Sequence, residues 1–180
     1  MNPFYKAYTD YFESIAAKHK DILHVIGDKD NCHFTAISIH DFQAGIVSKI
    51  KFPHLLLLKP ECTFINEKSE NILKNYLCMF MVLDKFSPTE TTPEQSIALF
   101  NKCEALGDEI IARMIDDREL GEEEGRSAFP KLAPFYNVSG TPVGDSKENN
   151  LYHGSKGWLI TFEMLWPLDQ LPDNTKWTDL

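Results

Sequence analysis

The stretch from Thr92 to Asp117 reads TPEQSIALFNKCEALGDEIIARMIDD and predicts one long helix. Thr92 is a good helix cap, Pro93 suits the first helical position, and Gln95 completes a capping box with Thr92. Apolar residues then recur at the spacing of a buried helix face: Ile97, Phe100, Cys103, Leu106, Ile110 and Met114. We therefore expect this helix to cover another layer of the domain and to end before Gly121.

The other layer is a sheet, predicted from three apolar runs. Residues 54–65 (HLLLLKPECTFI) and 76–83 (YLCMFMVL) are expected to pair as a hairpin whose second strand is central. Pro60 predicts a bulge or break, and places the first strand at an edge there, because proline lacks a ladder donor. The run 158–166 (WLITFEMLW) alternates, and its core face is expected to hold Trp158, Ile160, Phe162, Met164 and Trp166.

Weaker patterns predict the remaining elements. A first amphipathic helix begins after Asn2 and Pro3, ends near Lys20, and carries Phe4, Tyr8, Tyr11, Ile15 and His19 on one face. That aromatic face suits packing on the sheet or contact with a neighbouring subunit. Residues 33–40 predict a short strand, residues 41–51 a short helix, and residues 127–157 a loop-rich stretch with a strand near Phe135, Tyr136 and Val138.

Together these patterns predict the fold class α+β, with a small, mainly antiparallel sheet flanked by an N-terminal helix and a long central helix. The chain has 180 residues, of which 43% are hydrophobic, and this length suits a single domain. We expect residues 1–166 to form that domain and residues 167–180 to form a C-terminal tail. The tail keeps Leu168, Leu171 and Trp177, which either fold back on the domain or reach a neighbour.

The overall charge and the cysteines limit the classes of partner and compartment. The net charge of −9 argues against general binding to nucleic acid or to anionic membranes. The chain shows no signal-peptide pattern and no apolar run of membrane-spanning length. Cys32, Cys62, Cys78 and Cys103 lack close paired spacing, so we expect reduced cysteines in a cytoplasmic protein.

Residue chemistry predicts no catalytic, cofactor-binding or metal-binding residues. Cys32 and His33, with His40, come nearest to a cluster, but their spacing matches no zinc pattern. The glycines of residues 153–157 (HGSKG) precede a strand, whereas a phosphate-binding loop precedes a helix, so we interpret them as a hairpin turn. The acidic residues after the long helix are interpreted as a solvated loop.

The order of the elements, with the texts FPHLLLL (52–58), CEALGDEIIARMIDD (103–117) and GWLITFEML (157–165), resembles small structural proteins of bacterial prophages and related mobile elements. The resemblance is to the tail-terminator or tail-completion type. It implies a non-enzymatic α+β subunit that assembles into a ring at the head–tail junction or the tail end, so its partners are proteins, including itself as a homo-oligomer. The chain departs from this family in residues 121–154 and in its tail.

Two alternatives stay open. One is a small enzyme or ligand-binding domain, because many enzymes carry no short motif. The other is an immunity-like module that binds one protein partner, for which the acidic net charge is suggestive. The first helix and the tail are the segments expected to supply contacts between copies.

Overall fold

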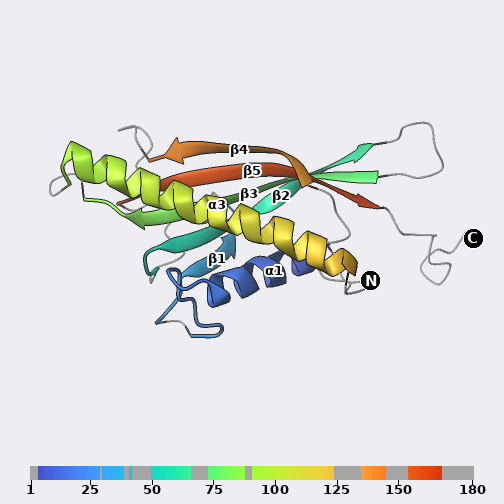
Figure 1. Cartoon of the computed structure of the whole chain (residues 1–180), viewed down its shortest axis with the longest axis horizontal. Helices are drawn as coiled ribbons and strands as arrows, with labels where there is room; N and C mark the ends of the chain where they lie inside the picture. Colours follow the sequence, from blue (N-terminus) through green and yellow to red (C-terminus); the bar gives the residue numbers. More distant parts are fainter. Residues whose placement is uncertain are drawn as a thin grey trace, which may run out of the picture.

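The computed structural model describes residues 4–28, 30–38, 41, 50–65, 73–87, 91–123, 135–144 and 154–167. These ranges contain α1 (Phe4–Lys18), β1 (Phe34–Ile37), β2 (His54–Ile65), β3 (Leu73–Lys85), α3 (Pro93–Glu123), β4 (Phe135–Val143) and β5 (Ser155–Pro167), as Figure 1 shows. The described strands form one sheet in the order β1-β2-β3-β5-β4. β1 runs parallel to β2, and the other neighbouring pairs are antiparallel. The predicted α+β class is confirmed.

The helices α1 and α3 cover the same face of the sheet. α3 crosses β3 and β5, and α1 lies against β1 and β2 (Figure 1). Their buried side chains meet the inward-facing residues of the strands in one core. On β5 that core takes Ile160, Phe162, Met164 and Trp166, with Trp158 packed partly against it, so the predicted core face of the last strand is confirmed.

The aromatic face of α1 packs on the sheet, as the core interpretation predicts. Phe4 stacks on Tyr76 of β3 with ring centroids 3.7 Å apart, and Phe12 lies 5.3 Å from Phe80. The predicted stripe named Tyr11 in place of Phe12. Phe12 is fully buried, whereas Tyr11 is half-buried and donates its hydroxyl proton to Asp117 of α3 at 3.0 Å. The tyrosine thus lies at the border between core and solvent, where its hydroxyl finds a polar partner.

The N-terminus of α3 has the predicted capping box. The Thr92 backbone N–H donates to Gln95 Oε1 at 2.8 Å, and the Gln95 N–H donates to Thr92 Oγ1 at 3.3 Å. Two details of the sequence prediction were wrong. Ile97 is 61% exposed, because the first turns of α3 pack only partly and full burial begins at Cys103. The helix also continues past Gly121 to Glu123, since a single glycine weakens a helix without ending it.

The predicted hairpin is the antiparallel pair β2–β3, and β3 lies centrally between β2 and β5. A register shift between Leu58 and Glu61 confirms the bulge expected at Pro60. β1 pairs with β2 only from Leu55 to Leu58, so among the described residues Pro60 lies on an unpaired edge, as predicted.

The remaining predicted segments have different outcomes. The short strand expected in residues 33–40 is β1, and the strand expected near Phe135 is β4. The helix predicted for residues 41–51 falls mostly outside the described residues: Asp41 is helical, whereas Ile50 and Lys51 are not. The predicted turn at residues 66–71 also lies outside the described residues. Of the predicted tail (167–180), Pro167 is the last residue of β5, and residues 168–180 lie outside the described part of the chain.

Candidate functional site

Three histidines gather where β1 and β2 begin, and we call them the histidine cluster: His24, His33 and His54. His24 comes from the loop after α1, His33 precedes β1, and His54 is the first residue of β2. His24 and His54 are buried, and His33 is half-buried. From the sequence, Cys32 and His33 with His40 come nearest to a cluster. The structure brings Cys32 and His33 together with His24, and His40 lies outside the described residues.

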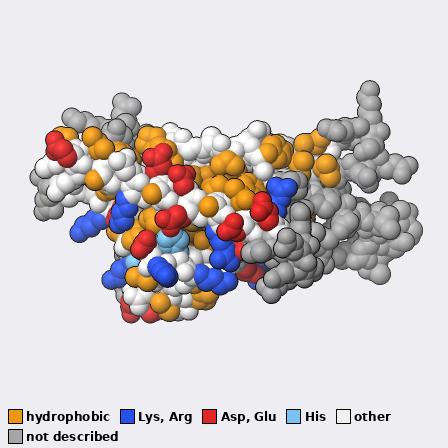
Figure 2. All heavy atoms as spheres, in the orientation of Figure 1, with side chains coloured by type: hydrophobic (Ala, Val, Ile, Leu, Met, Phe, Trp, Pro, Cys, Tyr) orange, Lys and Arg blue, Asp and Glu red, His pale blue; other side chains and the backbone are white. Residues whose placement is uncertain are grey.

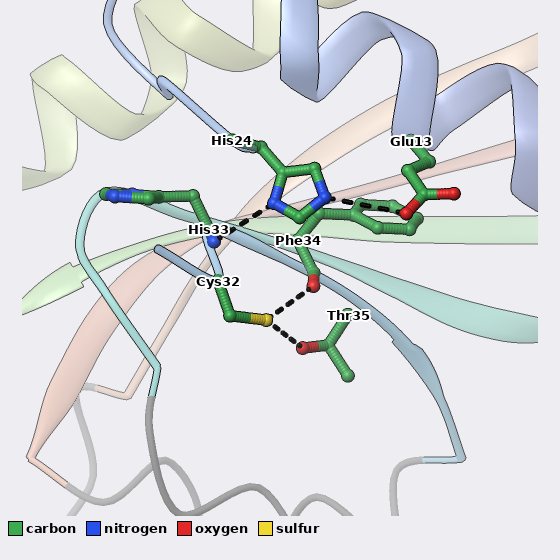
Figure 3. Close-up of polar contacts among 6 residues, drawn as sticks. All are labelled: Glu13, His24, Cys32, His33, Phe34 and Thr35. Atoms are coloured by element: carbon green, nitrogen blue, oxygen red, sulfur yellow. Dashed lines mark hydrogen bonds and ion pairs between the residues drawn. The ribbon is translucent and has the colours of Figure 1, made fainter. Parts of the chain in front are cut away.

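His24 connects α1 to the start of β1 (Figure 3). Its Nδ1 accepts the backbone N–H of His33 at 3.3 Å, so Nδ1 carries no proton in the neutral ring. The proton of that tautomer is therefore on Nε2, which lies 3.5 Å from Glu13 Oε1 of α1. This separation is an ion-pair distance rather than a good hydrogen bond, and Nε2 has no hydrogen-bond partner among the described residues. His24 therefore acts as a brace between the two elements.

Cys32 and His33 also have structural partners. His33 Nδ1 lies 2.8 Å from the carbonyl oxygen of Pro53, and a carbonyl only accepts, so Nδ1 is the protonated nitrogen. The Cys32 thiol donates to the carbonyl oxygen of Phe34 at 3.1 Å and lies 3.9 Å from Thr35 Oγ1 (Figure 3). A nucleophilic cysteine needs a contact with a base, whereas this thiol directs its proton to a backbone carbonyl.

His54 is the most deeply buried member of the cluster. It is 0% exposed, and neither ring nitrogen has a hydrogen-bond partner among the described residues. The pKa of His54 is lowered to about 4, chiefly because the ring is buried; the backbone of Cys32 and Lys51 opposes this shift, and the nearby His33 and His24 add to it by smaller amounts. The ring is therefore neutral at pH 7.

A polar network lies on the sheet face opposite the helices. Both oxygens of Glu163 accept amide hydrogens, from Asn75 at 2.6 Å and from Asn137 at 2.9 Å. Tyr136 donates to the Asn75 side-chain oxygen at 3.0 Å. The amides of Asn137 and Asn75 lower the pKa of Glu163, so this carboxylate stays ionised at neutral pH and suits neither a general acid nor a proton reservoir.

Lys156 belongs to the glycine-containing stretch 153–157. It lies in β5, and its ammonium sits 3.9 Å from the ring centroid of Phe86 and 5.4 Å from that of Phe100. Its Nζ also donates to Ser96 Oγ of α3 at 3.3 Å. A phosphate-binding lysine extends toward its ligand, whereas this one is only 8% exposed and joins β5 to α3. Ser155, Lys156 and Gly157 are paired residues of β5, so the interpretation of the stretch as a hairpin turn was wrong for these three positions.

Two further kinds of residue bear on catalysis and metal binding: the cysteines and the possible metal ligands. Each of the four cysteines is a free thiol, and burial raises the pKa of Cys103 to about 12 and that of Cys78 above its ordinary range. Over the described ranges, no three His, Cys, Asp or Glu side chains lie together in a way that would hold a metal ion.

His24 and His54 were not predicted as members of a cluster. His54 directly precedes four leucines, which is a signal for burial, and His24 lies between apolar residues in the text ILHVI. Neither signal shows that residues thirty positions apart meet. That meeting depends on the parallel pairing of β1 with β2, which brings His33 beside Pro53 and Leu55.

No protein-family model matches the chain, and neither a curated protein nor a solved structure is significantly similar to it. In the described part of the chain, no helix combines the length and the hydropathy that crossing a membrane requires.

Proposed function

We propose that the protein is a non-catalytic assembly subunit that binds other proteins, including further copies of itself, as a tail-terminator or tail-completion protein does. The observation that carries this proposal is a group of exposed hydrophobic side chains in the loop between α1 and β1. We call Leu23, Val25 and Ile26 the apolar loop. They are 63%, 48% and 62% exposed. Neighbouring large apolar side chains that face solvent are typical of interaction sites.

The backbone of the apolar loop is held in place. Ile22 and His24 are buried on either side of Leu23, so they anchor the loop to the core. The Asp28 N–H donates to the Val25 carbonyl at 3.1 Å. Such bracing reduces the conformational entropy that binding would cost. The apolar side chains are therefore displayed on a defined surface.

A second group of observations supports a role without catalysis. Three reactive side chains of the described chain have partners within the fold: the Cys32 thiol donates to a carbonyl, His24 braces α1 and β1, and Glu163 accepts two amides. Through these contacts the side chains stabilise the fold. The resemblance to tail-completion proteins supplies the setting in which an assembly subunit would act.

Solution mass tests the proposal. We expect light scattering over a concentration series to give a mass above that of the 20.6 kDa chain. The double variant Leu23→Asn and Ile26→Ser should shift that mass to the monomer while the melting temperature stays unchanged. Asparagine suits position 23, because Leu23 has a φ of 58°, a conformation that Asn adopts more readily than Leu.

Ile97→Ser is the matched control, because Ile97 is similarly exposed on α3 but lies outside the apolar loop. The control should assemble like the parent. A parent that is monomeric at every concentration contradicts self-assembly, and a double variant that assembles like the parent shows that the apolar loop is not the contact. Neighbouring genes for tail tube, sheath or portal proteins would independently favour the tail assignment.

A module that binds one basic protein is a second candidate, and the surface of α3 favours it. Acidic side chains recur along this helix (Figure 2), and the exposed ones include Glu94, Asp108, Glu109, Asp116 and Glu119. Lys102 and Arg113 of the same helix are paired with Asp84 and Asp117. Salt separates the candidates, because binding through α3 should weaken as ionic strength rises, whereas contact through the apolar loop should persist.

A further inference from the structure

His54 lies at the point where β1 joins the sheet. Three contacts tie the start of β1 to the start of β2 around it. The Lys51 N–H donates to the Cys32 carbonyl at 3.0 Å, His33 Nδ1 donates to the Pro53 carbonyl at 2.8 Å, and the Leu55 N–H donates to the His33 carbonyl at 2.8 Å. These residues are close to His54 in sequence or face it. A change in the protonation of the His54 ring should therefore affect their contacts.

Within the described ranges, no acidic side chain faces His54. From the loop after α1 the facing group is His24, from the segment before β1 it is His33, and from the segment before β2 it is the backbone of Lys51. On β3 the register partner is Leu83, which is fully buried and uncharged. Among the described residues, Glu13 of α1 is the carboxylate that contacts the cluster, and it faces His24.

We propose that this site is an acid-operated latch: uncharged His54 lets β1 and the loop before it close onto β2, and protonation of His54 releases them. A proton on the closed ring would be buried with neither ring nitrogen in a geometrically formed hydrogen bond, so the backbone of Cys32 and Lys51 offsets only part of the cost of burying the charge. Release exposes the ring to water, which removes this penalty. The released segment includes the apolar loop of Leu23, Val25 and Ile26, but the latch itself does not require that this loop binds a partner.

The effect of the proton can be expressed as the ratio of the opening equilibrium constants at acid and at neutral pH. Closure holds the pKa of His54 at about 4, whereas an exposed histidine titrates near about 6.5. The open form therefore binds the proton more tightly, and acid favours opening. From these two values the opening equilibrium should rise roughly fiftyfold between about pH 7 and about pH 4.5.

Hydrogen exchange of the full chain, followed by mass spectrometry, tests the latch. Labelling at neutral pH and at acid pH, with times scaled for the intrinsic exchange rate, compares peptides that cover β1 and the start of β2 with peptides that cover β5. We expect acid to lower the protection of the backbone amides of Phe34–Ile37 and His54–Leu58 roughly fiftyfold. The amides of Ser155–Pro167 should stay protected. Low protein concentration is needed, because the isoelectric point is about 5.1.

The variant His54→Leu cannot take up the proton and should keep β1 protected in acid. If circular dichroism shows that it does not fold, His54→Gln takes its place. His19→Gln is the control, because His19 lies in the loop after α1, away from His54, and pairs with Glu109; this variant should open like the parent. The latch is refuted if the His54 variant opens as the parent does, if acid leaves β1 of the parent protected, or if β5 loses protection together with β1.

Discussion

At the scale of single residues, the protein buries two basic side chains in different ways. Lys156 has its ammonium over the ring of Phe86, near the ring of Phe100, and bonded to Ser96, so aromatic faces and a hydroxyl replace part of its hydration. His54 has no such partners in the described chain and is neutral instead. Burial of Lys156 is thus compensated by contacts, whereas burial of His54 depends on pH.

The depressed pKa of His54 predicts an acid-dependent loss of global stability. Because the folded pKa lies below the unfolded one, the unfolded state binds more protons between about pH 6.5 and about pH 4, and the free energy of unfolding falls as pH falls through that window. The expected loss is roughly 3 kcal/mol for a shift of this size. Urea titrations at several pH values measure it.

In the variant His54→Leu, the free energy of unfolding should change less with pH than in the parent over the same window. Glu163 affects only the acid end of that window, because its pKa is lowered from 4.5 and its contribution to stability begins to fall only below that pH. If the free energy of unfolding falls equally steeply with pH in parent and variant, the acid sensitivity belongs to other groups.

At the scale of elements, α3 is held by the residues that its sequence pattern places inward. Ile110 is fully buried between the helix and the sheet, so Ile110→Ala should lower the free energy of unfolding by about 2–5 kcal/mol. Ile115→Ala on the exposed side of the same helix is the control, with an expected change within about 0.5 kcal/mol. Chemical denaturation measures both values. An unchanged midpoint for Ile110→Ala would contradict the packing of α3 on β3 and β5.

The contact between β3 and β5 depends on a glycine. A Cβ on Gly157 would lie 1.9 Å from the Val82 carbonyl oxygen, and backbone atoms cannot move aside without separating the strands. Gly157→Ala should therefore cost at least about 3 kcal/mol. Thermal melting compares it with Gly107→Ala, whose Cβ would meet only the flexible end of Ile160 and whose helix propensity rises. Equal melting temperatures for the two variants would refute this difference.

Elements with strong periodicity could be predicted from the sequence, and contacts between distant segments could not. The capping box of Thr92 and Gln95, the bulge at Pro60 and the inward face of β5 follow from local chemistry that tertiary structure did not override. Ile97 fits the helical pattern of α3 but is exposed, because periodicity does not say how far the sheet extends beneath a helix. The histidine cluster was missed for a related reason, since it depends on the pairing of β1 with β2.

At the scale of the whole molecule, the two faces of the sheet differ. The helices cover one face, and the opposite face is divided along the strands. At one end it carries a small apolar cluster of Leu56, Leu58, Met81 and Leu83. At the other end it carries the polar network around Glu163. The division follows from the strand texts, because outward positions of β3 and β5 change from leucine and methionine to asparagine, threonine and glutamate.

The order of the strands also has a consequence for the rate at which the chain folds. β3 and β5 pair along all 13 residues of each strand, yet α3 and β4 lie between them in the sequence. The hairpin β2–β3 can form from neighbouring segments, whereas β5 must arrive after a long loop has closed, which costs entropy before any contact is gained. The centre of the sheet should therefore be completed late and slowly during folding, and until then β3 presents an apolar edge that favours aggregation.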